Sequence, residues 1–184
     1  MACIGNIEAS LAMPCGAPNR ADLGKPVSAK ILNASDIESF TVGPDGVAVI
    51  TRVPTRVGYD VTTVNNALTV TVGLKSQDIM PGAYDVSITF KSFGNSHALV
   101  SSALPLGVVS TLTRAELVIA VDHGDVVRVY GLGAPLVCTE MSGDSSESAY
   151  ITYTYGVEDW QVGTTVHYLS KADYDALSTP APEP

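Results

Sequence analysis

The stretch ELVIAVDHGDVVRVYGLGAPLVCTEMSGDSSESAYITYTYG, residues 116–156, decides the fold of this chain. Short runs of Val, Ile, Tyr and Thr alternate in it with clusters of Gly, Asp and Ser. β-branched and aromatic residues favour strands, whereas Gly and Asp between two such runs favour turns. The tetrapeptide DHGD at 122–125 lies between the first two runs and predicts a hairpin. The stretch therefore predicts four consecutive β-strands.

On the C-terminal side this pattern continues and then changes. TTVHYLS at 164–170 predicts a fifth strand, and KADYDALS at 171–178 predicts a final helical turn. STPAPEP at 178–184 is polar and Pro-rich, and such a segment has no apolar face to bury. We therefore expect the domain to end near residue 170 and residues 171–184 to form a C-terminal tail.

Earlier in the chain, short alternating runs between turn residues predict further strands. In AYDVSITFKS, residues 83–92, one face carries apolar side chains and the other carries polar ones. ALTVTVG, residues 67–73, shows the same period of two, with Leu and Val against Thr. The face expected to be buried in the first run is Tyr84, Val86, Ile88 and Phe90. The remaining runs are PVSAKILN (26–33), GVAVITRV (46–53) and GYDVTTV (58–64).

Three local signals refine this outline. GPDG at 43–46 is a strong turn signal. Ser35 and Glu38 have the spacing of a capping box, which predicts a turn of helix in ASDIESF. Asn65 and Asn66 tolerate a positive φ, so they predict a hairpin between the strands that flank them.

About nine short strands with a turn roughly every ten residues are typical of a sandwich or barrel. The sequence therefore predicts an all-β fold, a β-sandwich or half-barrel with one or two short helices. One helix is expected near Val109–Arg114, after Pro105 and Gly107 have interrupted the preceding segment. Residues 1–25 mix Pro, Gly and small residues without a period, so we expect an N-terminal arm before a domain at 26–170.

Charge is distributed unevenly along the chain, which has a net charge of −9. Acidic and basic residues balance up to Arg114, whereas from Ala115 onward eleven acidic residues accompany only Arg128 and Lys171. This acidic half argues against direct phosphate binding. Two interpretations remain: a solvated surface, or carboxylates that face DNA which must not adhere. The second interpretation concerns Asp122, Asp125, Asp144, Glu147, Glu158 and Asp159.

Targeting signals and a disulfide framework are both unexpected in this sequence. No run of about eighteen apolar residues occurs, so no membrane-spanning helix is expected. The start of the sequence lacks a basic region followed by an apolar core, so we expect no signal peptide and folding in a reducing cytoplasm. Three Cys at irregular spacing argue against a disulfide framework, although a bridge between Cys3 and Cys15 remains an alternative. Cys138 is predicted to be a small buried hydrophobe.

Residues with catalytic or metal-binding chemistry are few and scattered. His97, His123 and His167 have no neighbouring Cys or carboxylate at metal-binding spacing, and no Ser lies in a nucleophile motif. Asp144 and Glu147, in a serine-rich loop, are too few for a calcium site, which needs six to eight oxygen ligands. We therefore expect the protein not to be an enzyme and to require no cofactor or metal.

Three remaining features suggest contacts with other molecules. His167 is predicted to lie in a strand, at the surface or at an interface. Trp160 either closes one end of the core or anchors a partner chain or a sugar. The strand Tyr150–Tyr155 places Ile and Tyr on one face and Tyr and Thr on the other, which suits a subunit contact or a half-buried sheet. GLGAP at 131–135 is predicted to be a turn, because it lacks the third Gly of a dinucleotide motif.

The order of these elements resembles the C-terminal half of the tail tube proteins of tailed bacteriophages. In that family an apolar strand and a short turn precede a strand that ends in aromatic–Gly–Leu, here Tyr130-Gly131-Leu132. A strand and a Ser-Gly-Asp-Ser loop follow, here 142–145, and then a Tyr/Thr-rich strand, here Tyr150–Tyr155. The opening MACIGNIEASLAMPCG and the later PVSAKILNASDIESF are also similar to the family's Cys-containing arm and first strand. The resemblance covers about half of the chain.

This resemblance implies a β-sandwich or half-barrel whose strands continue across subunits into a ring with an inner β-barrel. It implies a structural virion protein, assembled in the cytoplasm of a host bacterium, that forms a homo-oligomeric ring with a DNA-conducting channel. Its partners would be other virion proteins, with transient, non-adhesive contact to genomic DNA.

Two departures from the family keep other functions open. The segment Ser96–Leu106 is longer than in the family, and residues 157–177 extend past its usual end. A head–tail connector ring, a tail-barrel protein or a capsid decoration protein therefore remain alternatives. From a different class, a sugar-binding β-sandwich adhesin is the further alternative.

Overall fold

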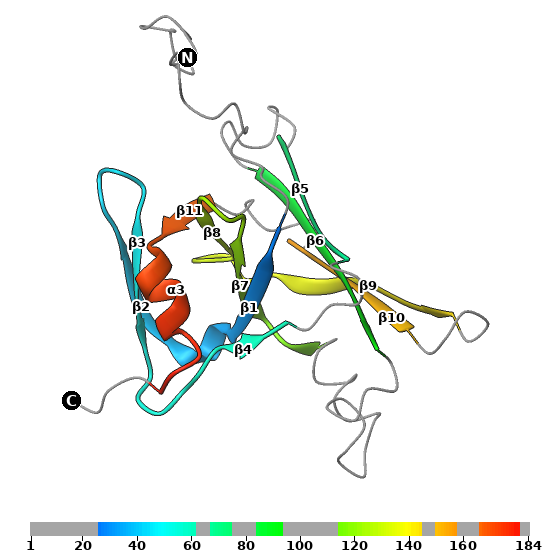
Figure 1. Cartoon of the computed structure of the whole chain (residues 1–184), viewed down its shortest axis with the longest axis horizontal. Helices are drawn as coiled ribbons and strands as arrows, with labels where there is room; N and C mark the ends of the chain where they lie inside the picture. The colour runs from blue at the N-terminus through cyan, green and yellow to red at the C-terminus, as the bar shows by residue number, and fades with distance from the viewer. Residues whose placement is uncertain are drawn as a thin grey trace, which may run out of the picture.

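The computed structural model describes residues 26–61, 67–74, 84–93, 114–144, 150–157 and 166–180. Within these ranges, eleven strands form three antiparallel sheets, and α3 (Lys171–Ala176) is the one α-helix. The described strands do not close a barrel. The predicted all-β class is confirmed, in the form of a sandwich with a third layer on one face (Figure 1).

The central sheet holds five antiparallel strands. Their order across the sheet is β11 (Val166–Leu169), β8 (Val127–Tyr130), β7 (Leu117–Asp122), β1 (Ser28–Asn33) and β4 (Tyr59–Asp60). The DHGD turn joins β7 to β8, as predicted: the N–H of Gly124 donates to Oδ1 of Asp122 at 2.8 Å. The φ of Gly124 is +90°, a conformation that residues with a Cβ rarely adopt.

The second sheet holds four antiparallel strands and packs against one face of the central sheet. Their order is β5 (Leu68–Leu74), β6 (Tyr84–Phe93), β10 (Tyr150–Gly156) and β9 (Val137–Asp144), so that β5 and β9 are the edges. Val86, Ile88 and Phe90 of β6 are buried between the two sheets, as their alternation predicted.

The third layer covers the opposite face of the central sheet. It consists of the hairpin β2 (Ile37–Val42) and β3 (Ala48–Arg52) together with α3 (Figure 1). The 3₁₀ turn η1 (Ala34–Asp36) leads from β1 into this hairpin. GPDG forms the predicted turn at the hairpin tip, where the N–H of Gly43 donates to the carbonyl of Val47 at 2.9 Å.

Two apolar cores lie on the two faces of β7, all six residues of which are buried. The sandwich core, between the central and four-stranded sheets, includes Leu117, Ile119, Val121, Tyr130, Val86, Ile88, Phe90, Tyr153 and Tyr155. The helix-side core, between the central sheet and the third layer, includes Val118, Ala120, Leu32, Val129, Leu169, Tyr174, Leu177 and Ala48.

The turn of helix predicted in ASDIESF is confirmed as η1, but the capping box predicted at Ser35 and Glu38 is wrong. Asn33 occupies the N-cap position of η1 and makes no side-chain cap bond, and Glu38 lies in β2. Pairing of β2 with β3, with one register shift between Ile37 and Ser39, satisfies backbone groups and packs the partly buried Ile37 and Ile50 against the helix-side core. Strand pairing from Ile37 onward therefore limits the helical turn to Ala34–Asp36.

The hairpin predicted at Asn65-Asn66 is also not formed by the described strands on either side of it. β4 pairs with β1, with Lys30 opposite Asp60, whereas β5 pairs with β6 along its whole length. The two strands thus belong to different sheets. A turn signal reports only local backbone freedom, so it does not determine which sheet each strand joins.

The folded domain extends past residue 170. The predicted helical turn is confirmed as α3, and the N–H of Asp173 donates to Oγ of Ser170 at its N-cap. Tyr174 and Leu177 are 2% and 3% exposed in the helix-side core. Residues 171–177, which were expected to belong to a C-terminal tail, therefore pack against the domain.

We predict that Phe90→Ala lowers the free energy of unfolding by roughly 3–5 kcal/mol, the usual cost of removing a buried aromatic ring. The Phe90 ring is 4% exposed and lies 5.5 Å, centroid to centroid, from the rings of both Tyr153 and Tyr155. Denaturant unfolding measures the change. Thr69→Ala, at an exposed position of the neighbouring strand, is the control and should change stability by less than about 0.5 kcal/mol. Equal effects of the two substitutions would contradict the assigned core.

Candidate functional site

The outer face of the four-stranded sheet is the candidate functional site, because short hydroxyl side chains cover it. The register places Thr69, Thr89 and Thr154 in one row across β5, β6 and β10. Residues paired across antiparallel strands point to the same face of the sheet. We call this surface the hydroxyl face and define it by Thr69, Thr71, Ser87, Thr89, Ser142, Thr152 and Thr154.

Its origin is a repeated tripeptide in three neighbouring strands. β5 reads Thr-Val-Thr at 69–71, β6 reads Ser-Ile-Thr at 87–89, and β10 reads Thr-Tyr-Thr at 152–154. The middle residue of each tripeptide packs against the sandwich core, so the hydroxyl residues on either side of it face outward. The predicted division of the strand Tyr150–Tyr155 into two faces is thereby confirmed for 151–155, with Tyr153 and Tyr155 fully buried.

Hydrogen bonds within the sheet hold some of these hydroxyls. The Oγ1 atoms of Thr89 and Thr154 lie 3.2 Å apart, and Oγ1 of Thr139 donates to the carbonyl of Thr154 at 3.2 Å. β-branched side chains also have few rotamers. The hydroxyl face is therefore a stiff, polar surface, which does not need to reorganise on contact.

Charge on this face is sparse and nearly balanced. Among outward-facing residues of the four strands whose side chains the structure describes, the charged ones are Asp85, Lys91 and Glu140. Glu140 continues the row of Thr69, Thr89 and Thr154 onto β9. The described part of the face therefore presents one ammonium group and two carboxylates to a polyanion.

The two edges of this sheet differ. β5 reads LTVTVGL, seven residues without a charge or a Pro, and its pairing with β6 has no bulge. Natural proteins usually protect an exposed edge strand with charges, Pro or a bulge. β9 carries Glu140, and its register with β10 shifts between Thr154 and Tyr155. Among the described residues, β5 is thus an edge without such protection, suited to pairing with another strand.

Asp122, one of the carboxylates proposed to face DNA, is buried at 5% exposure. Its Oδ2 accepts from Nζ of Lys171 at 2.7 Å, and this bond raises the pKa of the lysine. The interpretation that Asp122 faces a DNA channel is therefore wrong. Its carboxylate instead binds Lys171, the first residue of α3. The next residue, His123, is also buried, and its N–H donates to the carbonyl of Val126 at 2.9 Å.

His167 and Cys138 occupy partly buried positions with shifted pKa values. His167 lies in β11 with its ring centroid 6.3 Å from that of Phe40 in β2, and burial lowers the pKa of its imidazole. Cys138 is a free thiol packed against the sandwich core, and burial raises its pKa. Cys138 was predicted to be a small buried hydrophobe; it packs against the core but is only half-buried. A raised thiol pKa disfavours the reactive thiolate.

Several predicted features fall outside the described residues. They are the arm at 1–25 with Cys3 and Cys15, the helix near Val109–Arg114 before its last residue, His97, Glu147, Glu158, Asp159 and Trp160. Of Asp144, the structure describes the backbone at the end of β9. Within the described part of the chain, no three His, Cys, Asp or Glu side chains are grouped so that they could hold a metal ion.

Comparisons with known proteins identify no relative of this chain. The chain matches no family model, and no curated protein or solved structure matches it. None of the described helices is long and apolar enough to span a membrane.

We predict that the stability of the domain falls as the pH drops below about 6.5, in part through His167. Its folded-state pKa is lowered from 6.5, so the unfolded chain binds more protons in this range. The contribution is complete above the unfolded pKa and decreases below it. Denaturant unfolding at pH 7.5 and 5.5 should show a smaller loss for His167→Gln than for the unchanged protein. An equal loss in both would exclude His167 as a source.

Proposed function

We propose that this protein is a structural subunit that assembles into a ring, as a tail tube subunit of a tailed bacteriophage does. The observation that supports this most directly is a four-stranded sheet that combines an unprotected edge, β5, with an outer face of hydroxyl side chains. In a ring, the four-stranded sheets of neighbouring copies join edge to edge, and the hydroxyl face lines the channel.

The topology of the sheet supports such joining. Its four strands alternate in direction, so β5 and β9 run in opposite directions. Rotation about an axis roughly parallel to the strands preserves the direction of each strand. β9 of one copy therefore meets β5 of the next in antiparallel orientation, and the sheet continues with the ladder pattern it already has.

Joining also satisfies both exposed edges. An open edge leaves a row of unpaired N–H and C=O groups, which invites pairing with another chain. A heterologous contact of this kind closes into a ring when the rotation between copies divides a full turn. The sandwich core then lies outside the channel wall, and the third layer lies farther from the channel.

The hydroxyl face suits the passage of DNA. Affinity for DNA comes largely from Lys and Arg that neutralise phosphates. Lys91 is the one such residue among the outward-facing side chains described for this sheet, and Asp85 and Glu140 oppose its charge. Threonine and serine hydroxyls keep the wall wetted, so DNA passes with transient contact and without adhesion.

This role requires no catalysis, cofactor or metal, and it places the protein in the virion after assembly in the cytoplasm of the host bacterium. Other virion proteins would be its partners. A connector ring would use the same sheet joint and remains the second candidate on the same observation. An adhesin that binds sugars is disfavoured, because no aromatic side chain is described on the hydroxyl face.

We predict that disulfides form between copies across the joint of β5 and β9. The variants combine Thr69→Cys or Thr71→Cys on β5 with Glu140→Cys or Ser142→Cys on β9, all at exposed positions. Native Cys3 and Cys15 are replaced by Ser and Cys138 by Ala. Mild oxidation should give a series of covalent multimers in at least one combination, seen by non-reducing electrophoresis. The combination whose two cysteines lie opposite each other across the joint should crosslink most.

Two controls make this result specific. Thr41→Cys with Thr51→Cys places two exposed thiols on the hairpin and should give no multimer series. Thr71→Cys alone should give no covalent dimer under the same oxidation. A covalent dimer would indicate that two β5 edges pair with each other. Absence of multimers in all four combinations, at a concentration where particle mass shows assembly, would refute the joint.

A further inference from the structure

Arg52, the last residue of β3, connects the hairpin to the end of α3. Its guanidinium donates to the carbonyls of Ala176, Leu177 and Thr179 at 3.1, 2.8 and 3.0 Å. It also donates to the carbonyl of Arg56 at 3.1 Å. Three of the four acceptors are thus at or just beyond the C-terminal end of α3, where helix carbonyls have no partner within the helix.

Neither part of the third layer is expected to be stable alone. α3 has six residues, far below the length of about 12–15 residues at which isolated helices become marginal. A two-stranded hairpin is marginal in water as well. Each element therefore depends on its contacts with the other and with the helix-side core. We call residues 37–52 and 171–179 together the cover layer.

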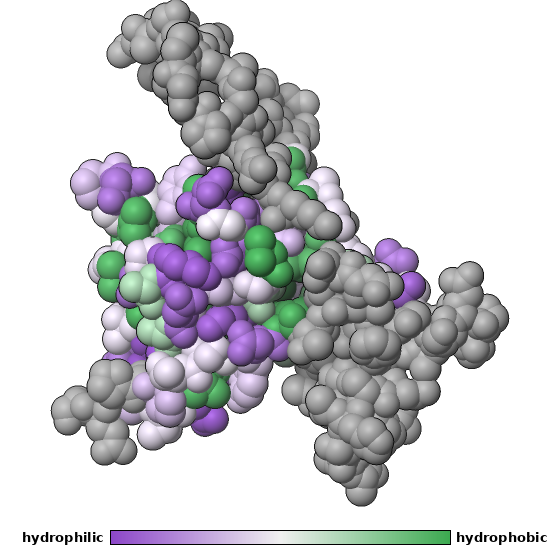
Figure 2. All heavy atoms as spheres, in the orientation of Figure 1, coloured by the Kyte–Doolittle hydropathy of each residue, from purple (hydrophilic) through white to green (hydrophobic). Residues whose placement is uncertain are grey.

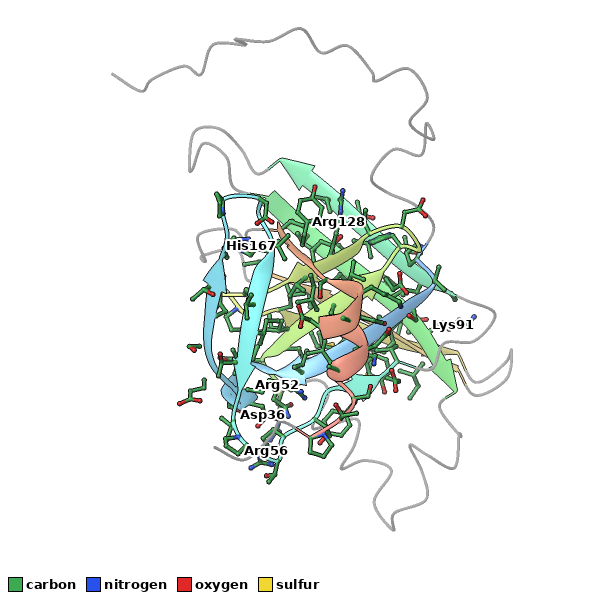
Figure 3. All side chains as sticks on the ribbon, turned by 60° about the vertical axis from the view of Figure 1, so that its left-hand side comes forward. Asp36, Arg52, Arg56, Lys91, Arg128 and His167 are labelled. Carbon is green, nitrogen blue, oxygen red and sulfur yellow. The ribbon has the colours of Figure 1, made fainter. Side chains whose placement is uncertain are left out.

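Polar contacts also tie the cover layer to the rest of the domain. The N–H of Gly58 donates to the carbonyl of Leu177 at 2.7 Å, Nζ of Lys30 donates to the carbonyl of Asp175 at 3.3 Å, and Oγ of Ser178 donates to Oδ2 of Asp60 at 3.3 Å. Oγ of Ser28 and the hydroxyl of Tyr174 lie 2.8 Å apart, Nζ of Lys30 donates to Oγ of Ser178 at 2.7 Å, and Lys171 pairs with Asp122. At the hairpin tip, the N–H of Tyr168 donates to the carbonyl of Gly46 at 3.0 Å. Figure 3 shows Arg52 at the opposite end of the hairpin from His167, beside Asp36 and Arg56.

The sandwich core is separate from the helix-side core. The two sets of buried residues share no member, and β7 lies between them. Departure of the cover layer would uncover the apolar side chains Leu32, Val118, Ala120, Val129 and Leu169 of the central sheet. It would leave the contacts of the sandwich core in place.

We propose that Arg52 is a latch that makes the hairpin and α3 one cooperative unit, which opens from the central sheet while the sandwich stays folded. Proteins open locally in such units, with free energies below that of global unfolding. The single guanidinium joins the two halves because it belongs to the hairpin and holds the end of α3. Hydrophilic residues over α3 keep the closed layer soluble on its outer side (Figure 2).

Native-state hydrogen exchange on the full chain tests this proposal. In the unchanged protein, slowly exchanging amides of 37–52 and 171–177 should show one common free energy of opening. This free energy should be lower than that of the amides in β6 and β10. Arg52→Gln should accelerate exchange in both parts by about tenfold, as expected when hydrogen bonds from a charged donor are lost. The amides of the hairpin and of α3 should then exchange at different rates. The exchange rates of amides in β6 and β10 should change less than about twofold.

Arg56→Gln is the matched control. Arg56 lies at the same end of the hairpin and pairs with Asp36 at 3.5 Å, but its side chain is 61% exposed. This variant should leave the shared opening of the cover layer unchanged. Arg52→Lys keeps the charge and reaches fewer carbonyls, so it should give an intermediate acceleration and serves if Arg52→Gln does not fold.

Three outcomes would overturn the proposal. In the first, the hairpin and α3 of the unchanged protein open with clearly different frequencies. In the second, loss of Arg52 accelerates only one of them. In the third, β6 and β10 accelerate in parallel with the cover layer, which would mean that Arg52 stabilises the whole domain and latches no separate unit.

Discussion

Burial of β7 on both faces is the constraint on which the rest of the structure depends. Leu117, Ile119 and Val121 point into the sandwich core, while Val118 and Ala120 point into the helix-side core. A strand that is apolar on both faces needs a layer on each side, because either uncovered face would expose a row of apolar side chains. The four-stranded sheet covers one face. The hairpin and α3 cover the other, so the third layer is required by the sequence of one strand.

Much of the fold follows from local patterns in the sequence. β5, β6 and β10 alternate strictly, and their buried and exposed faces are read directly from that period of two. DHGD and GPDG sit where a chain reversal needs a glycine with positive φ, so both turns are also predictable. The assignment of β4 and β5 to different sheets is not predictable in this way. Which sheet each of these two strands joins depends on the apolar face that it covers. That face is defined only by the whole fold.

The candidate site was predictable in part. The alternation of Thr with Val, Ile and Tyr predicts strands with one hydroxyl surface, but only the register reveals that three such strands lie side by side with Thr69, Thr89 and Thr154 in one row. The role of Asp122 was not predictable, because its partner Lys171 is 49 residues away in the sequence. Nor was the role of Arg52, whose three helix-end acceptors are up to 127 residues distant. A count of charges along a sequence does not distinguish charged side chains that have partners in the fold from those that are solvated.

The two cores separate the four-stranded sheet from the cover layer, because β7 lies between them. The hydroxyl face and the edges β5 and β9 belong to a sheet that packs on the sandwich core. The cover layer is held by the helix-side core and by hydrogen bonds and an ion pair to the central sheet and its loops, and the described buried residues of that core include none from the four-stranded sheet. Motion of the cover layer therefore need not disturb the geometry of β5 and β9. If copies join through β5 and β9 as we propose, the joint therefore lies on one side of β7 and the cover layer on the other.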